Sequence, residues 1–125
     1  MPTSQLSKGQ AEAAITKAVV QFERDHMGRG PYDARTWIVQ DMILIRLQGV
    51  LTPAEEKLAQ DTEGKNLIKQ VRTQLIESSR ALLESMVGEI TGIPVVSLHS
   101  DISTRTGERI ILLTMASNLE ACFSR

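Results

Sequence analysis

Residues 34–48 are rich in Ile, Val and Thr, which favours β-strands. Gln40 and Asp41 interrupt the apolar pattern, which predicts a two-residue turn that places Val39 opposite Met42. Because side chains alternate between the faces of a strand, one face carries Thr36, Ile38, Ile43, Ile45 and Leu47, and the other carries Arg35, Trp37, Val39, Met42, Leu44 and Arg46. Both faces of this hairpin are apolar, so both sides of the sheet are candidates for burial.

Three helices are indicated by capping signals and apolar spacing. SKGQ at residues 7–10 forms a capping-box pattern for a helix over residues 8–27. TPAE at residues 52–55 predicts a shorter helix that ends near residue 60. Apolar spacings of three and four predict a long helix over residues 64–91, with the stripe Leu67, Ile68, Val71, Leu75, Leu82, Leu83, Met86 and Ile90. We expect this long helix to pack across a sheet rather than to form a coiled coil.

A second hairpin is predicted over residues 94–103 and 108–116, with turn chemistry in Thr104–Gly107. With Ile102 placed opposite Ile110, one face carries Val96, Leu98, Ile102, Ile110 and Leu112, and the other carries His99, Asp101, Ile111, Leu113 and Met115. The element order is then α-β-β-α-α-β-β in a single domain over residues 1–125. We predict an α+β two-layer sandwich, in which long helices pack on one four-stranded, mostly antiparallel sheet.

Composition narrows the class of protein. The net charge of −1 and the 3% content of aromatic residues disfavour nucleic-acid binding. The single cysteine, Cys122, cannot form an internal disulfide, which fits a reducing compartment. Residues 1–20 have no continuous apolar segment typical of a signal peptide, and no apolar run approaches the ~18 residues of a membrane span. We expect a cytoplasmic protein with no transmembrane segment and no nucleic-acid partner.

His99 and Asp101 are the most specific candidates for a metal-binding or catalytic site. On one strand they share a face at a Cα separation of about 7 Å, which suits two metal ligands or an acid–base pair. A metal normally needs three or four ligands, and the only other histidine is His26, so a structural or interface role is preferred. No Gly-x-Ser-x-Gly turn surrounds Ser100 or Ser103. We therefore predict no catalytic residue, no metal and no cofactor.

Arg35 and Arg46 lie opposite one another in the predicted first hairpin. Like charges in cross-strand positions need an acidic neighbour or a bound anion. Asp101 or Glu108 is a candidate neighbour from the second hairpin. Alternatively, Arg35, Arg46, His99 and Asp101 surround a small-ligand site for an anion or metabolite. Both alternatives remain open from the sequence.

The second sheet face bears most directly on function. Its predicted apolar members are Trp37, Val39, Met42, Leu44, Ile111, Leu113 and Met115, with Arg35, Arg46, His99 and Asp101 among them. Helices often cover only one face of an antiparallel sheet, and an exposed apolar face of several hundred Å² is unusual on a monomer. A two-fold homodimer would cover it, whereas a helix on each face would leave a monomer. We prefer a non-enzymatic, homodimeric interaction module, with a small-ligand-binding regulatory domain as the alternative.

Five stretches together resemble a known family: GRGP at 28–31, DMILIRLQGVLTPAE at 41–55, TGIPVVS at 91–97, HSDIST at 99–104 and TGERII at 106–111. Over about residues 5–120 the chain resembles the bacterial MpsC-like family, named after the C component of a sodium-translocating, membrane-potential-generating system. The resemblance implies a link to a membrane system for sodium or inorganic carbon. A chain with no spanning segment would serve that system as an accessory or regulatory partner. The resemblance implies no catalytic residues.

Overall fold

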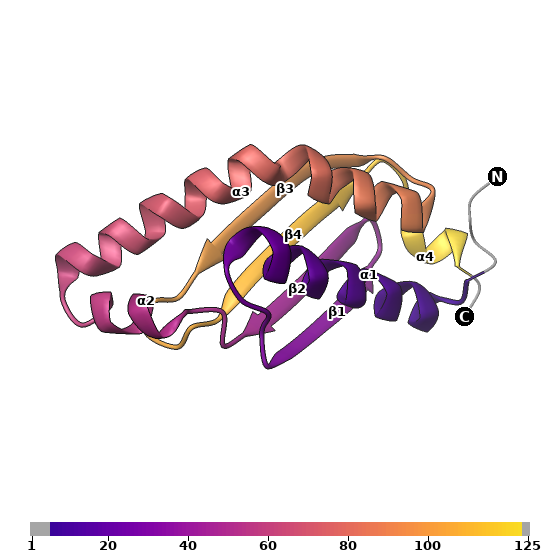
Figure 1. The fold of residues 1–125 in the computed structure, drawn as a ribbon. Helices are drawn as coiled ribbons and strands as arrows, with labels where there is room; N and C mark the ends of the chain where they lie inside the picture. Colours follow the sequence, from indigo (N-terminus) through magenta and orange to yellow (C-terminus); the bar gives the residue numbers. More distant parts are fainter. Residues whose placement is uncertain (1–5, 124–125) are drawn as a thin grey trace.

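The computed structural model describes residues 6–123. Its elements are α1 (Lys8–Phe22), the π-helical turn η1 (Glu23–Met27), β1 (Asp33–Val39), β2 (Met42–Gln48), α2 (Pro53–Leu58), α3 (Thr62–Thr91), β3 (Val95–Ile102), β4 (Arg109–Met115) and α4 (Leu119–Cys122). The strands form one antiparallel sheet in the order β1-β2-β4-β3. In Figure 1, α1 and α3 lie across the same side of the sheet. The predicted α+β fold and element order are confirmed, and no described helix is long and apolar enough to cross a membrane.

Both predicted capping boxes are present. The Gln10 backbone N–H donates to Ser7 Oγ at 3.1 Å, and the Ser7 N–H donates to Gln10 Oε1 at 2.9 Å. Thr52 and Glu55 make the same reciprocal pair at the start of α2. These bonds satisfy backbone donors that the first helical turn leaves unpaired. Local sequence chemistry therefore fixes where both helices begin.

An aliphatic core fills the space between the helices and one sheet face. The helices and the strands contribute Ala11, Ile15, Val19, Phe22, Ile68, Ile76, Leu83, Val87, Ile38, Ile43, Ile45, Leu47, Leu98, Ile102, Ile111, Leu113 and Met115 to it. The predicted stripe of α3 is partly wrong, because Leu67, Val71 and Leu82 are 44–48% exposed. A charged residue, Arg72, occupies the core-facing position between Ile68 and Ile76 instead. The face of α3 predicted from its apolar residues is therefore rotated about the helix axis relative to the face that packs on the sheet.

The first hairpin has the predicted register, with Val39 opposite Met42. The second hairpin is one residue out of the predicted register, because Ile102 pairs with Arg109 rather than with Ile110. The Ser103 N–H donates to the Glu108 carbonyl oxygen at 2.8 Å and closes a shorter loop than expected. A slip of one residue moves every side chain of β4 to the opposite face.

Three predicted members of the second face are therefore wrong: Ile111, Leu113 and Met115 are 0%, 0% and 4% exposed beneath the helices. Ile110 and Leu112 take their places on the side away from the helices. The error arises because an arginine is ordinarily expected to face water. Arg109 faces the core instead, where its guanidinium lies 3.6 Å from the Glu23 carboxylate.

Candidate functional site

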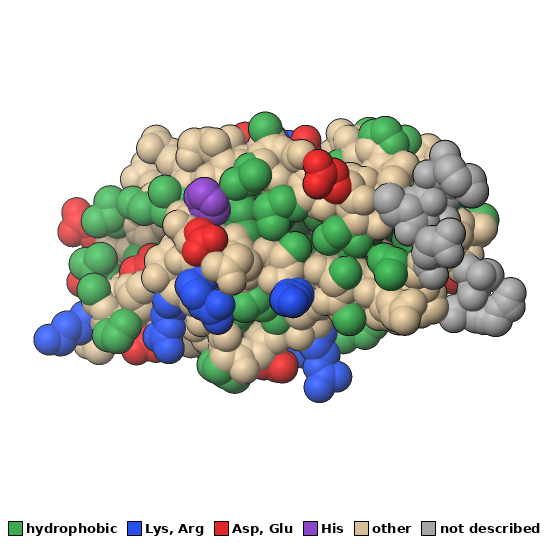
Figure 2. Space-filling view, turned by 45° about the vertical axis from the view of Figure 1, so that its right-hand side comes forward, with side chains coloured by type: hydrophobic (Ala, Val, Ile, Leu, Met, Phe, Trp, Pro, Cys, Tyr) green, Lys and Arg blue, Asp and Glu red, His purple; other side chains and the backbone are tan. Residues whose placement is uncertain are grey.

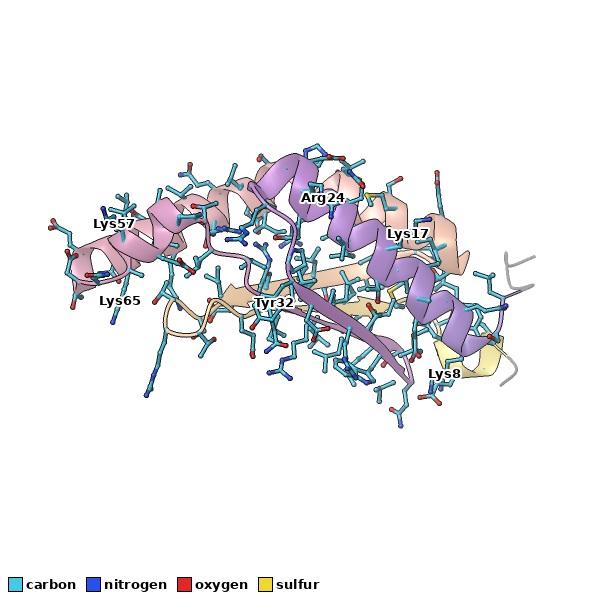
Figure 3. All side chains as sticks on the ribbon, turned by 60° about the horizontal axis from the view of Figure 1, so that its bottom comes forward. Lys8, Lys17, Arg24, Tyr32, Lys57 and Lys65 are labelled. Atoms are coloured by element: carbon cyan, nitrogen blue, oxygen red, sulfur yellow. The ribbon has the colours of Figure 1, made fainter. Side chains whose placement is uncertain are left out.

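The sheet face turned away from the helices is the first candidate site and is called the open face. Figure 3 shows the helices on one side of the sheet and side chains projecting from the other. Strand pairing defines three rows across it, each written from β1 to β3: Val39, Met42, Thr114 and Ser97; Trp37, Leu44, Leu112 and His99; Arg35, Arg46, Ile110 and Asp101. The structure therefore places all eight of the remaining predicted residues on this one face.

The first two rows make the open face apolar. Trp37 is 38% exposed and Val39 is 44% exposed, while Met42, Leu44 and Leu112 are half-buried. A sheet face that meets only water normally carries polar side chains. Figure 2 shows a different side of the molecule, that of the helices, where hydrophobic side chains lie among acidic and basic ones. The open face has the composition of a surface that another molecule covers.

In the third row, the basic residues Arg35 and Arg46 lie at one end and the acidic residue Asp101 lies at the other. Arg46 Nη2 lies 3.0 Å from Glu108 Oε1, and Arg35 Nε lies 3.9 Å from Asp33 Oδ2. Glu108 is therefore the acidic neighbour of Arg46. Asp101 lies two strands away from Arg46, about 10 Å at ordinary strand spacing, with Ile110 between them. The structure does not bring Arg46 and Asp101 together around the predicted small-ligand site.

His99 and Asp101 lie at the β3 edge of the open face. His99 Nε2 is 3.5 Å from Ser97 Oγ, and Asp101 Oδ1 accepts from the Ile102 N–H at 2.8 Å and from Lys69 Nζ at 3.3 Å. The Ile102 hydrogen bond, aided by Lys69, lowers the pKa of Asp101. Asp101 thus joins β3 to α3 as an ionised carboxylate. Residues 6–123 contain no group of three or more His, Cys, Asp or Glu arranged to hold a metal ion.

A buried charge cluster is the second candidate site, and sequence reasoning missed it. Glu23, Arg72 and Arg109 are 0%, 3% and 2% exposed. Arg72 donates two hydrogen bonds to the Glu55 carboxylate, from Nε at 3.0 Å and from Nη2 at 2.6 Å. It also donates from Nη2 to the Val50 carbonyl oxygen at 2.8 Å. Glu23 lies farther from its partners, 3.9 Å from Arg72 and 3.6 Å from Arg109. The cluster therefore contains one tight ion pair and two loose ones.

Burial and ion pairing oppose one another in this cluster. Burial raises the pKa of Glu23 against the pull of Arg109 and Arg72. Burial also lowers the pKa of Arg109, against the pull of Glu23. Burial also raises the pKa of Glu55, but the hydrogen bonds from Arg72 and Thr52 outweigh this effect, so the pKa is lower than its ordinary value. The sequence signal for this cluster is a charged residue at a core-facing position in each of three elements.

The fold defines a small two-layer α+β protein, in which the described helices leave one sheet face uncovered. A family model described as "Na+-translocating membrane potential-generating system (MpsC)" matches residues 7–117, and the chain belongs to this family. The Bacillus subtilis (strain 168) protein "Uncharacterized protein YbcI" is 43% identical over 114 residues, which cover 91% of this chain and 92% of that protein. "Uncharacterized protein YrhF" of the same strain is 32% identical over 84 residues, or 66% and 68% of the two chains. No solved structure matches the chain significantly.

Proposed function

We propose that this protein is a non-enzymatic, cytoplasmic interaction module that forms a homodimer through the open face. The observation that carries the proposal is the apolar row of Trp37, Leu44 and Leu112 on a sheet face that α1 and α3 leave uncovered. The family description supplies the setting, a sodium-translocating system that generates membrane potential. In that setting the dimer serves as an accessory or regulatory subunit of a membrane system for sodium or inorganic carbon.

The rows of the open face on one copy complement the same rows on a second copy. A two-fold axis that runs along the strands sets β1 of one copy over β3 of the other. Arg35 then faces Asp101 of the second copy, and Leu44 faces Leu112 of the second copy. An axis across the strands would set Arg35 over the apolar Val39 row. Charge complementarity therefore selects a second copy as the occupant and an axis along the strands.

The size of the open face predicts a reversible dimer. Four strands of about seven residues give a face roughly 19 Å wide and 24 Å long. Two such faces bury on the order of 1,000 Å², at the lower end of specific protein interfaces. We expect a dissociation constant in the micromolar range, because interfaces of this size leave little free energy beyond the cost of association.

A charge exchange tests the proposed arrangement. Arg35→Glu or Asp101→Arg alone places like charges opposite one another twice per dimer, so we expect either change to weaken dimerisation about tenfold. The double variant restores opposite charges and should recover most of the wild-type dissociation constant, measured by sedimentation equilibrium. Arg105→Glu, in the exposed loop after β3, is the control for the altered net charge. Equal weakening in the double variant and in both single variants would contradict the proposed axis.

A further inference from the structure

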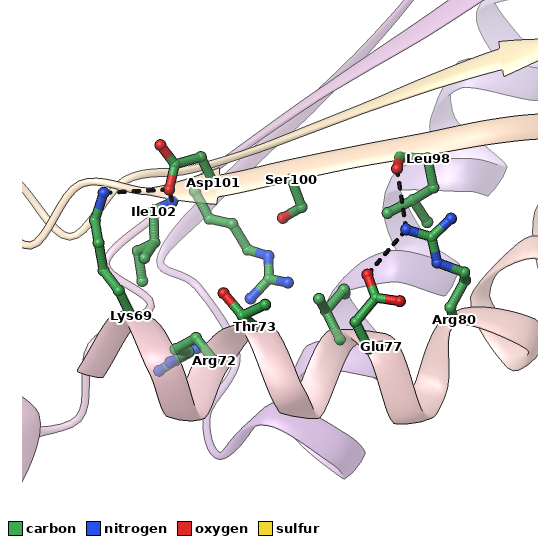
Figure 4. Close-up of a pocket in the computed structure, with 11 residues that line it drawn as sticks. Lys69, Arg72, Thr73, Glu77, Arg80, Leu98, Ser100, Asp101 and Ile102 are labelled. Atoms are coloured by element: carbon green, nitrogen blue, oxygen red, sulfur yellow. Dashed lines mark hydrogen bonds and ion pairs between the residues drawn. The ribbon is translucent and has the colours of Figure 1, made fainter. Parts of the chain in front are cut away.

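A cavity of about 70 Å³ lies between α3 and β3, on the opposite side of β3 from the open face. Basic side chains line it from α3 and from β4: Lys69, Arg72 and Arg80 belong to α3, and Arg109 belongs to β4. The hydroxyl-bearing side chains of Thr73 and Ser100 point into the same space (Figure 4). A cavity needs roughly 10–15 Å³ of this kind of volume to hold one water, so this one has room for a small ligand.

Several buried donors around this cavity make no hydrogen bond to the described residues. Arg109 Nε and Nη1, Arg72 Nη1 and Arg80 Nε are fully buried without a hydrogen-bond partner there. Arg109 is the extreme case, because its side chain is 2% exposed and lines the cavity. A buried charged donor that makes no hydrogen bond costs more than the roughly 1–3 kcal/mol of a neutral one. An acceptor placed in the cavity would remove that cost.

The nearby carboxylates are already held by other cations. Glu77 pairs with Arg80 at 2.9 Å, and Asp101 pairs with Lys69 at 3.3 Å (Figure 4). Glu55 is held by two hydrogen bonds from Arg72, so among the described residues Glu23 is the only carboxylate within ion-pair distance of Arg109. That contact is 3.6 Å long and is not a hydrogen bond. Arg109 is thus the least compensated cation of the cluster.

We propose that the cavity binds a small oxyanion, a carboxylate or phosphate group, on the guanidinium of Arg109. A guanidinium presents a planar fork of donors that matches such groups. Arg80 and the hydroxyls of Thr73 and Ser100 supply further donors around the bound oxygen atoms. The volume restricts the bound group to a few non-hydrogen atoms. The site lies on the other side of the sheet from the open face, so it stands independently of the proposed dimer.

Titration of the whole protein with sodium acetate and with sodium phosphate tests this site. Ionic strength is held constant with sodium chloride, and the NMR signal of the Arg109 Nε–H reports binding. We expect saturable binding with a dissociation constant in the millimolar range or below. Saturation by acetate alone identifies a carboxylate ligand, and saturation by phosphate alone identifies a phosphate ligand. Saturation by both supports a general oxyanion site.

Two variants and a control link binding to this cavity. Arg80→Gln at the cavity wall should weaken binding at least fivefold, and Arg109→Lys should weaken it further. Arg105→Gln, an exposed change in the loop after β3, should leave the dissociation constant unchanged. Circular dichroism verifies that each variant is folded, and Arg80→Gln decides if Arg109→Lys does not fold. Failure of both anions to saturate the wild-type signal, or equal affinity in Arg80→Gln and wild type, would overturn the proposal in favour of a water-filled cavity.

Discussion

Arg72 links three elements through the atoms of one side chain. It extends from α3 to Glu55 of α2, to the Val50 carbonyl oxygen and towards Glu23 of η1. Glu55 also closes the capping box of α2, so one carboxylate serves both a helix start and the buried cluster. An ion pair of this kind is costly to break, because one partner would be left buried without the other.

We predict that Glu55→Gln destabilises the protein by about 1.5–3 kcal/mol near neutral pH, because the amide keeps the cap but loses the ion pair with Arg72. The pKa of Glu55 is lower in the folded state than its ordinary value of 4.5. The folded state then binds fewer protons than the unfolded state, so the stabilisation is present above pH 4.5 and is lost as the pH falls through the folded pKa. Urea unfolding at several pH values checks this. Glu56→Gln is the exposed control, and a loss independent of pH would contradict the assignment.

A second prediction concerns the loose pair of Glu23 and Arg109. Arg109→Leu leaves Glu23 buried with only the distant Arg72, so we expect a loss of about 3–5 kcal/mol. Adding Glu23→Leu removes the unpaired charge, and the double variant should be more stable than Arg109→Leu alone. Urea unfolding of the wild type and the three variants gives the coupling free energy. Additive losses would show that the pair does not interact.

At the scale of elements, local signals predicted more than long-range pairing did. The two-residue turn at Gln40–Asp41 restricts the first hairpin to one register, and that register is confirmed. The longer loop between β3 and β4 admits several registers, and choosing Ile110 over Arg109 as the core-facing residue gave the wrong one. The correct choice depends on Glu23, which is distant in sequence. The faces of Trp37 and Leu44 are therefore predicted correctly, whereas the whole apolar set of β4 is assigned to the wrong faces.

The contact between α2 and α3 gives a prediction at the same scale. A Cβ added at Gly64 would lie 1.8 Å from the Leu58 carbonyl oxygen, whereas a Cβ at Gly88 would lie 3.7 Å from its nearest neighbour. Alanine normally stabilises a helix interior relative to glycine by roughly 0.5–1 kcal/mol. We expect that gain for Gly88→Ala, and a loss of about 1–3 kcal/mol for Gly64→Ala because α2 must shift. Thermal unfolding of both variants checks the contrast, and a gain in both would contradict the close approach.

At the scale of the whole molecule, the two layers give the protein two dissimilar sides. The helices enclose the core and the buried charge cluster on one side of the sheet. The other side carries the apolar rows of the open face. A domain of this size gains stability mainly by burying apolar surface, and a second copy in the proposed dimer would extend that burial to the open face. The proposed dimer would therefore cover the sheet face that the helices leave open.

Sedimentation velocity over a range from micromolar to several hundred micromolar protein tests the dimer most directly. We predict that the wild type sediments as a reversible dimer and that Leu44→Glu sediments as a folded monomer, because it places a charge in the middle of the apolar row. Leu82→Glu makes the same change at a 44% exposed position of α3 and should remain dimeric. A wild type that stays monomeric throughout, or a Leu44→Glu variant that dimerises as the wild type does, would contradict the account.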